Sequence, residues 1–190
     1  MNNLIDHKLY NSENKAVKFS EKTLDRIKEI ILHYPEDRRK SALLPVLHIA
    51  QQESGGYLSV DVMDYVASLL ELQPIEVYEV ATFYSMFHLE PAGKYVIEVC
   101  RTGPCEICGS ERIVDQLERI LGIKTEETTS DGLFTMKTVE CLGSCGTAPV
   151  MQINSVFYES LTNEKIVQII DDLKNKAKSE PLETKWADLF

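Results

Sequence analysis

The sequence has no long apolar run and no excess of positive charge. None of its apolar stretches approaches the ~20 residues that a membrane-spanning helix needs, and its first residues lack the basic start and apolar run of a secretory signal. The 190 residues include 20 lysines and arginines against 30 aspartates and glutamates, a net charge of −10. This charge argues against nucleic acid or anionic lipid as the main partner. We therefore expect a cytoplasmic protein with no direct membrane insertion.

Motifs that bind dinucleotides are also missing. The sequence contains no G-x-G-x-x-G and no Gly-rich turn between a strand and a helix, so we expect the chain to bind neither NADH nor flavin by itself. Its 4 histidines all lie outside the cysteine-containing segment, whereas a Rieske centre needs two histidine ligands. The 5 cysteines are an odd number, which fits poorly with a fully paired disulfide framework. In a reducing cytoplasm, clustered cysteines indicate metal or redox chemistry.

Residues 20–90 have the period of amphipathic helices. Four such segments, separated by proline and glycine, predict a small N-terminal helical bundle whose last helix runs to about Phe87. That helix ends in an apolar run that is longer than one buried face uses, Phe83-Tyr84-Ser85-Met86-Phe87. We expect this bundle to be a docking domain for a partner subunit, because such patches rarely stay exposed. Residues 1–19 are polar and without periodicity, which predicts a flexible arm.

Residues 91–175 change to alternating strands and helices. The expected order is β-α-β-β-β-α, an α/β layer fold, after a boundary at Pro91-Ala92-Gly93. The expected strands are 95–99, 133–139, 150–153 and 156–158, and the expected helices begin at Ser110 and after Thr162. After Leu173 the sequence becomes strongly charged, and we expect an extended chain and a charged tail over 176–190.

Two pairs of cysteines follow the first two predicted strands of this region. Cys100 and Cys105 form a C-x4-C pair, and Cys141 and Cys145 form a C-x3-C pair. A strand-helix-strand crossover makes the two strands parallel, so both pairs should lie at the edge where open α/β sheets build their sites. Four thiolates are the ligands of a [2Fe–2S] cluster. The pattern therefore predicts such a cluster and a carrier of single electrons.

Cys108 permits a second ligand set. Exchanging Cys145 for Cys108 produces C-x4-C-x2-C with a distant fourth cysteine, the spacing of plant-type ferredoxins. We favour Cys145, because plant-type ligands lie in one long loop whereas here a capped helix begins at Ser110. In addition, Cys145 shares a Gly-rich loop with Cys141, and the plant-type set leaves it without a role.

Two other kinds of site remain open at the level of spacing. Structural zinc uses short C-x2–4-C knuckles, and both pairs fall within that window, so a zinc-stabilised interaction module is an alternative. The segment Cys105-Glu106-Ile107-Cys108 suggests a thiol-disulfide oxidoreductase. Against this, the strand-to-helix turn opens with Cys100 rather than with that C-x-x-C. A structural disulfide is disfavoured by the expected compartment.

The segments around the cysteines resemble the thioredoxin-like [2Fe–2S] ferredoxin family, and the likeness covers roughly residues 20–175. Within that family the chain is similar to the branch that serves respiratory complex I, NADH:quinone oxidoreductase. The segments that carry the resemblance are Val99-Cys100, Leu121-Gly122-Ile123-Lys124, Glu140-Cys141-Leu142-Gly143-Ser144-Cys145 and Val77-Tyr78-Glu79-Val80-Ala81-Thr82-Phe83-Tyr84. The resemblance implies a thioredoxin-like fold behind a helical extension. It assigns one [2Fe–2S] cluster to Cys100, Cys105, Cys141 and Cys145.

The resemblance also implies that the chain is one subunit of a larger complex. A partner subunit would bind FMN and NADH and exchange single electrons with this cluster, so the chain would have no catalytic residues of its own. Further subunits of the peripheral arm of complex I would be its other partners, and the complex would hold it peripherally at the membrane. The alternative within the same family is a diaphorase subunit of an NAD-linked hydrogenase or formate dehydrogenase, because the cluster and the flavin partner are shared.

Overall fold

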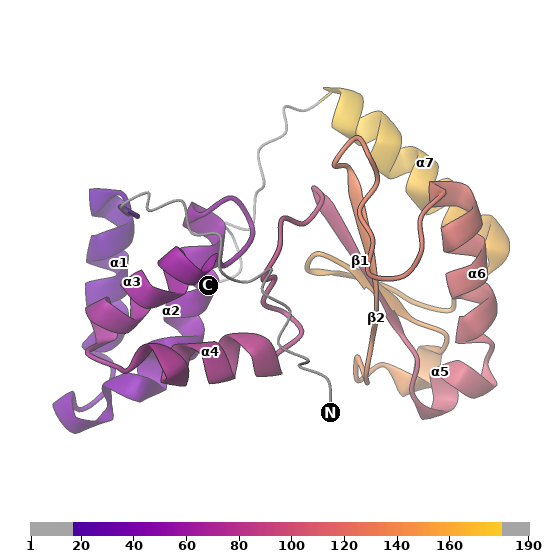
Figure 1. Cartoon of the computed structure of the whole chain (residues 1–190). Helices are drawn as coiled ribbons and strands as arrows, with labels where there is room; N and C mark the ends of the chain where they lie inside the picture. Colours follow the sequence, from indigo (N-terminus) through magenta and orange to yellow (C-terminus); the bar gives the residue numbers. More distant parts are fainter. Residues whose placement is uncertain (1–16, 180–190) are drawn as a thin grey trace, which may run out of the picture. The chain divides into compact units, whose positions relative to one another are not determined.

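The computed structural model describes residues 17–179. The predictions of a flexible arm and a charged tail therefore lie outside the described residues at 1–16 and 180–190. The chain divides into two compact units, Met1–Pro91 and Ala92–Phe190 (Figure 1), and each has its own hydrophobic core. Across the described part of the chain, every helix is too short or too polar to cross a membrane.

The first unit consists of helices. Ser20 and Ser59 act as N-caps, as their side chains predict, and accept the backbone N–H of Thr23 and Val62. A buried cluster of mostly aliphatic side chains from all four α-helices forms its core. The elements are α1 (Glu21–Ile31), the 3-10 helix η2 (Glu36–Ala42), α2 (Leu43–Glu53), α3 (Val60–Leu70) and α4 (Pro74–Phe83).

Two expectations for this unit are wrong. Helix α4 ends at Phe83 rather than near Phe87, and Phe87 is buried in the core with its ring 5.0 Å from that of His48. Phe19, expected in the flexible arm, is also buried, and its ring lies 5.0 Å from that of Tyr65. Burial of one phenyl ring contributes roughly 2 kcal/mol. This burial energy holds in place backbone that lies outside the helices. Such backbone has no periodic pattern in the sequence.

The second unit is a four-stranded sheet with the order β2-β1-β3-β4. Strand β1 pairs in parallel with β2, while β3 pairs antiparallel with β1 and β4 antiparallel with β3. Helices α6 and α7 cover one face of the sheet (Figure 1). The elements are β1 (Tyr95–Cys100), α5 (Gly103–Ile107), α6 (Ser110–Leu121), β2 (Phe134–Val139), η3 (Cys145–Thr147), β3 (Met151–Ile153), β4 (Val156–Tyr158) and α7 (Asn163–Ser179).

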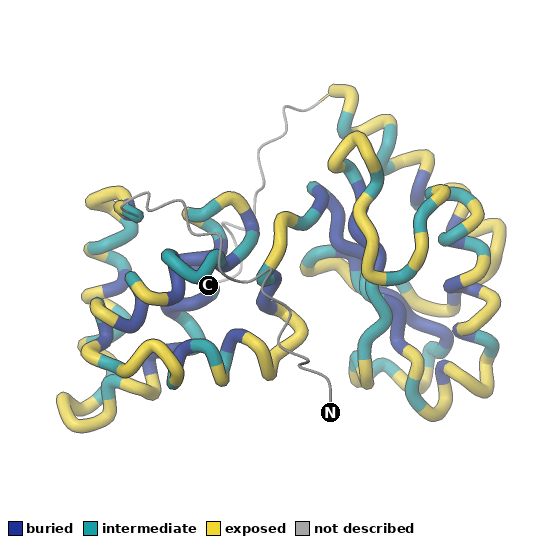
Figure 2. Tube along the Cα trace, in the orientation of Figure 1, coloured by how far each residue is buried: buried dark blue, intermediate teal, exposed yellow. Residues whose placement is uncertain are grey.

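The core of this unit lies between the sheet and the two long helices. Alternate strand residues such as Ile97 and Met136 point into it and meet Leu117 of α6 and Ile166 of α7, all of which are fully buried. Figure 2 shows the burial concentrated in the strands and on the inner sides of the helices. The expected order β-α-β-β-β-α is confirmed, with the short helix α5 added after β1.

Two details of this unit differ from the expectation. The extended chain predicted after Leu173 is wrong, because α7 continues to Ser179. Its last residues are mostly lysine, asparagine and alanine, and lysine and alanine are good helix formers that extend a helix already docked on the core. The sequence pattern does not predict helix α5. Its five residues are too few to show a helical period, and they include a glycine and a proline.

Candidate metal centre

The four cysteines of the favoured set lie at or just after the ends of two neighbouring parallel strands. Cys100 is the last residue of β1, and it lies opposite Val139, the last residue of β2. Cys141 follows two residues after β2, Cys145 begins η3, and Cys105 lies in α5. Because both strands end at the same level, the loops that carry the two pairs leave the sheet side by side.

The second loop reaches the sulfur of the first. The backbone N–H of Leu142 donates a hydrogen bond to the sulfur of Cys100. The backbone of Cys100 is held in turn by Val150, whose carbonyl accepts the Cys100 N–H at 3.2 Å. Leu142 also packs with Val150 and Ala148 around the first cysteine pair. Leu142 therefore brings the two loops, about forty residues apart in the sequence, into direct contact.

The thiols themselves form two pairs. Hydrogen bonding between Cys100 and Cys105 is among the causes that lower the pKa of Cys100 and raise that of Cys105, and hydrogen bonding with Cys141 raises the pKa of Cys145. Cys100 and Cys105 are only 3% and 2% exposed, whereas Cys141 and Cys145 are exposed. Charge interactions connect Cys145 with both Cys100 and Cys105 across the two loops.

The surroundings of the buried pair separate its two pKa values. Burial raises the pKa of the Cys100 thiol, but hydrogen bonds from the Thr102 hydroxyl, the Thr102 and Leu142 backbones and Cys105 outweigh it, so that the pKa is lowered overall. Burial and the hydrogen bond to Cys100 raise the pKa of Cys105 to about 11. Cys100 is therefore the thiol of this pair that deprotonates first, and thiolates are the form that binds metals.

The four thiols are a donor set that a [2Fe–2S] cluster can use. Over residues 17–179, no three His, Cys, Asp or Glu side chains gather in a group that could hold one metal ion. Structural zinc requires four ligands around a single ion, whereas a four-cysteine [2Fe–2S] cluster has two irons with two sulfur ligands each. Two thiol pairs carried by neighbouring loops are compatible with the second requirement.

Cys108 takes a different position from the other four cysteines. It lies at the C-terminal end of α5 and is exposed, while the charge interactions between the loops involve Cys145. The oxidoreductase alternative would use Cys105 as its nucleophile. Such a cysteine needs a lowered pKa, whereas the pKa of Cys105 is raised to about 11. Cys145 therefore stays the predicted fourth ligand, and the raised pKa of Cys105 is unlike that of a C-x-x-C nucleophile.

Two further groups donate to the sulfurs. The hydroxyl oxygen of Thr102 lies 3.4 Å from the sulfur of Cys100, and the backbone N–H of Gly143 donates to the sulfur of Cys141 at 3.3 Å. Gly143 has φ +79°, a left-handed conformation that favours glycine and turns this N–H toward the sulfur. The sequence showed the glycines of this loop. It did not indicate Thr102, whose only signal is that a residue with a hydroxyl group stands two positions after a cysteine.

Glu159 fastens the loop that carries Cys145. Both Ser144 and Thr147 donate side-chain hydrogen bonds to the Glu159 carboxylate, the latter at 2.7 Å. The backbone N–H of Ser160 donates to the carbonyl of Thr147 at 2.6 Å. The sequence does not indicate this clamp, because a glutamate after the last strand has no local signal that connects it with a loop before β3.

We expect Glu159→Gln to loosen this loop at neutral pH, with faster hydrogen exchange of the 144–147 backbone by mass spectrometry. The hydrogen bonds from Ser144 and Thr147 lower the pKa of Glu159, so its stabilising contribution is present above the ordinary glutamate pKa and is lost as pH falls through the lowered value. The difference between wild type and variant should therefore vanish at strongly acidic pH. The exposed Glu79→Gln is the control, and equal exchange in all three proteins at pH 7 would contradict the clamp.

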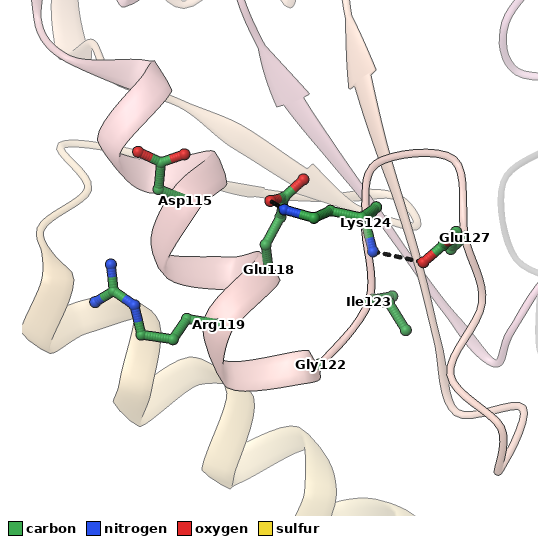
Figure 3. A pocket seen from close by; sticks show the side chains of 7 residues that line it. All are labelled: Asp115, Glu118, Arg119, Gly122, Ile123, Lys124 and Glu127. Carbon is green, nitrogen blue, oxygen red and sulfur yellow. Dashed lines mark hydrogen bonds and ion pairs between the residues drawn. The ribbon is translucent and has the colours of Figure 1, made fainter.

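A shallow hollow at the C-terminal end of α6 lies away from the cysteines, which are at the end of the unit where α6 begins. Its charged groups bind one another (Figure 3): the Lys124 ammonium lies 2.5 Å from the Glu118 carboxylate, and the Lys124 backbone N–H donates to Glu127 at 2.7 Å. These contacts fix the loop after α6. None of the proposed cysteine ligands lines this hollow.

Comparison with known proteins gives a consistent result. The family model described as "Thioredoxin-like [2Fe-2S] ferredoxin" matches residues 27–174. A protein of Rickettsia felis, named as a subunit of NADH-quinone oxidoreductase, is 48% identical over 161 residues, which are 85% of this chain and 96% of the relative. The mitochondrial NADH dehydrogenase [ubiquinone] flavoprotein 2 of Dictyostelium discoideum is 41% identical over 165 residues, 87% of this chain and 67% of the relative.

A solved structure supports the fold. A chain in the crystal structure of the air-oxidized NAD+-reducing [NiFe]-hydrogenase superposes with a TM-score of 0.64 at 22% sequence identity, covering 80% of this chain and 26% of that chain. At this identity the likeness concerns the fold alone. The family match spans most of the chain, includes every cysteine, and agrees with the observed order of strands and helices. The chain therefore belongs to the thioredoxin-like [2Fe–2S] ferredoxin family.

Proposed function

We propose that this chain is an electron-transfer subunit of an NADH-quinone oxidoreductase, with one [2Fe–2S] cluster held by Cys100, Cys105, Cys141 and Cys145. The observation that carries the proposal is the arrangement of these cysteines as two pairs at the ends of neighbouring parallel strands. It occurs in a chain 48% identical to a protein named as a subunit of that oxidoreductase. When bound, such a cluster accepts and releases one electron at a time.

The two pairs would have different roles. Cys100 and Cys105 would hold one iron on the buried side, where Val150 and Leu142 exclude water. Cys141 and Cys145 would hold the other iron on the exposed side, where a redox partner can approach. Backbone N–H groups of Leu142 and Gly143 already donate to ligand sulfurs, which is how a protein stabilises the negative charge of the thiolates.

The proposed redox partner is a subunit that binds FMN and NADH, with other subunits of the peripheral arm beside it. The names of the relatives and the lack of a dinucleotide motif in this chain support a separate subunit for NADH, and FMN is what the family resemblance implies. The helical unit supplies a docking surface at the end of α4, where Phe83 is 79% exposed, Tyr84 36% and Met86 38%. Through this complex the chain would lie in the cytoplasm, peripheral to the membrane.

The test is an EPR spectrum of the full-length chain, purified without oxygen and reduced with dithionite, together with iron and acid-labile sulfide analysis. The proposal predicts a rhombic S = ½ signal and two irons and two sulfides per chain. A colourless protein that contains zinc would overturn the cluster and favour the interaction module.

The assembly is tested separately. Affinity purification of the chain from its native cells should recover a flavoprotein together with quinone-reducing activity driven by NADH. Recovery with a hydrogenase or formate dehydrogenase instead would favour the diaphorase alternative, since this chain has the fold of part of a chain in the NAD+-reducing [NiFe]-hydrogenase. The cluster itself is tested by the EPR measurement, so the two parts of the proposal can fail independently.

A further inference from the structure

Thr102 occupies the position that precedes helix α5, the N-cap. A threonine in that position usually accepts a hydrogen bond from a backbone N–H of the first helical turn. Here the Thr102 side chain makes no such bond. The N–H of Cys105, which it would normally accept, donates instead to the backbone carbonyl of Thr102 at 3.0 Å, and Pro104 has no N–H to offer.

The hydroxyl is thereby free for a different contact. Its oxygen lies 3.4 Å from the sulfur of Cys100, and the Thr102 backbone N–H donates to the same sulfur. A thiolate has no proton to donate, so in a metal-bound Cys100 the hydroxyl is the donor. The Thr102 residue is half-buried, and Cys100 is only 3% exposed, so water competes poorly for this bond.

We infer that Thr102 is a positioning residue that raises the reduction potential of the cluster by donating its hydroxyl hydrogen to the Cys100 thiolate. This inference rests on the proposed ligand set. Reduction adds one electron from the reductant, breaks no bond and transfers no proton, so negative charge on the ligand sulfurs increases. A hydrogen bond to a ligand sulfur becomes stronger as that charge grows, which stabilises the reduced state and raises the potential.

The test is a redox titration of the full-length holoprotein, followed by the EPR signal as the potential is lowered with dithionite. Thr102→Val has nearly the shape of threonine but no hydroxyl, and we expect its midpoint potential to shift to a more negative value. Thr102→Ser keeps the hydroxyl, and we expect its midpoint to stay near that of wild type. Thr125→Val is the matched control, because Thr125 follows α6 at the opposite end of the unit and contacts Glu118.

The outcomes separate this inference from the proposed function. A wild-type chain without the EPR signal overturns both. A normal signal and an unchanged midpoint in Thr102→Val overturn the inference and leave the ligand set intact. If the valine variant does not retain the cluster, Thr102→Ala takes its place in the titration. Loss of the cluster from both hydroxyl-free variants would give Thr102 a structural role and would also overturn the inference.

Discussion

Replacing Cys145 with alanine is expected to abolish stable binding of the cluster, whereas replacing Cys108 with alanine should leave it in place. Alanine removes one of the four proposed sulfur ligands, and its loss exposes one iron to solvent. Changes outside the ligands already weaken metal sites by about 10–100-fold, so removal of a ligand should exceed that. Cluster content is measured from iron, sulfide and visible absorption of the purified chain, and the reduced form by EPR.

The comparison between these two cysteines decides between the ligand sets. Both residues are exposed in the same unit, so each substitution removes an exposed thiol at little cost in folding. Cys145→Ser is a useful intermediate, since its oxygen can still coordinate iron, and we expect an altered EPR spectrum. The opposite pattern, with the cluster kept in Cys145→Ala and lost in Cys108→Ala, would establish the plant-type set.

Gly93→Ala is expected to destabilise the ferredoxin unit by about 3 kcal/mol, near the upper end of the cost of overpacking. A Cβ atom at Gly93 would lie 2.8 Å from the carbonyl carbon and 2.9 Å from the nitrogen of Phe134. These are backbone atoms of the first residue of β2, so the chain cannot relax by turning a side chain. The N–H of Gly93 also donates to the Thr135 hydroxyl at 2.6 Å, and displacement would break that bond.

The measurement is urea unfolding of the full chain, followed by circular dichroism. Gly122→Ala is the control, because a Cβ there meets nothing within 4 Å but the residue has φ +69°, so its expected cost is only about 1 kcal/mol. Equal or smaller destabilisation by Gly93→Ala than by Gly122→Ala would contradict a clash with the Phe134 backbone.

Local patterns in the sequence determined much of this protein. The N-caps at Ser20 and Ser59 and the two-residue turn at Asn154-Ser155 are encoded within a few residues, and the structure places the helices and the hairpin there. The parallel pair β1–β2 also followed from the sequence, because a strand-helix-strand crossover has one common solution. The placement of the cysteines beyond those strands could therefore be predicted before any coordinates.

Only the tertiary structure decided the contacts between residues that are distant in the sequence. Glu159 binds the loop of Cys145, and Leu142 reaches the sulfur of Cys100. Phe87 is buried outside any helix. None of these depends on a periodic pattern or on a neighbour within one helical turn; each depends on how the folded backbone brings separate segments together. The sequence by itself determined which residues can serve as ligands, and the fold determined which groups surround and orient them.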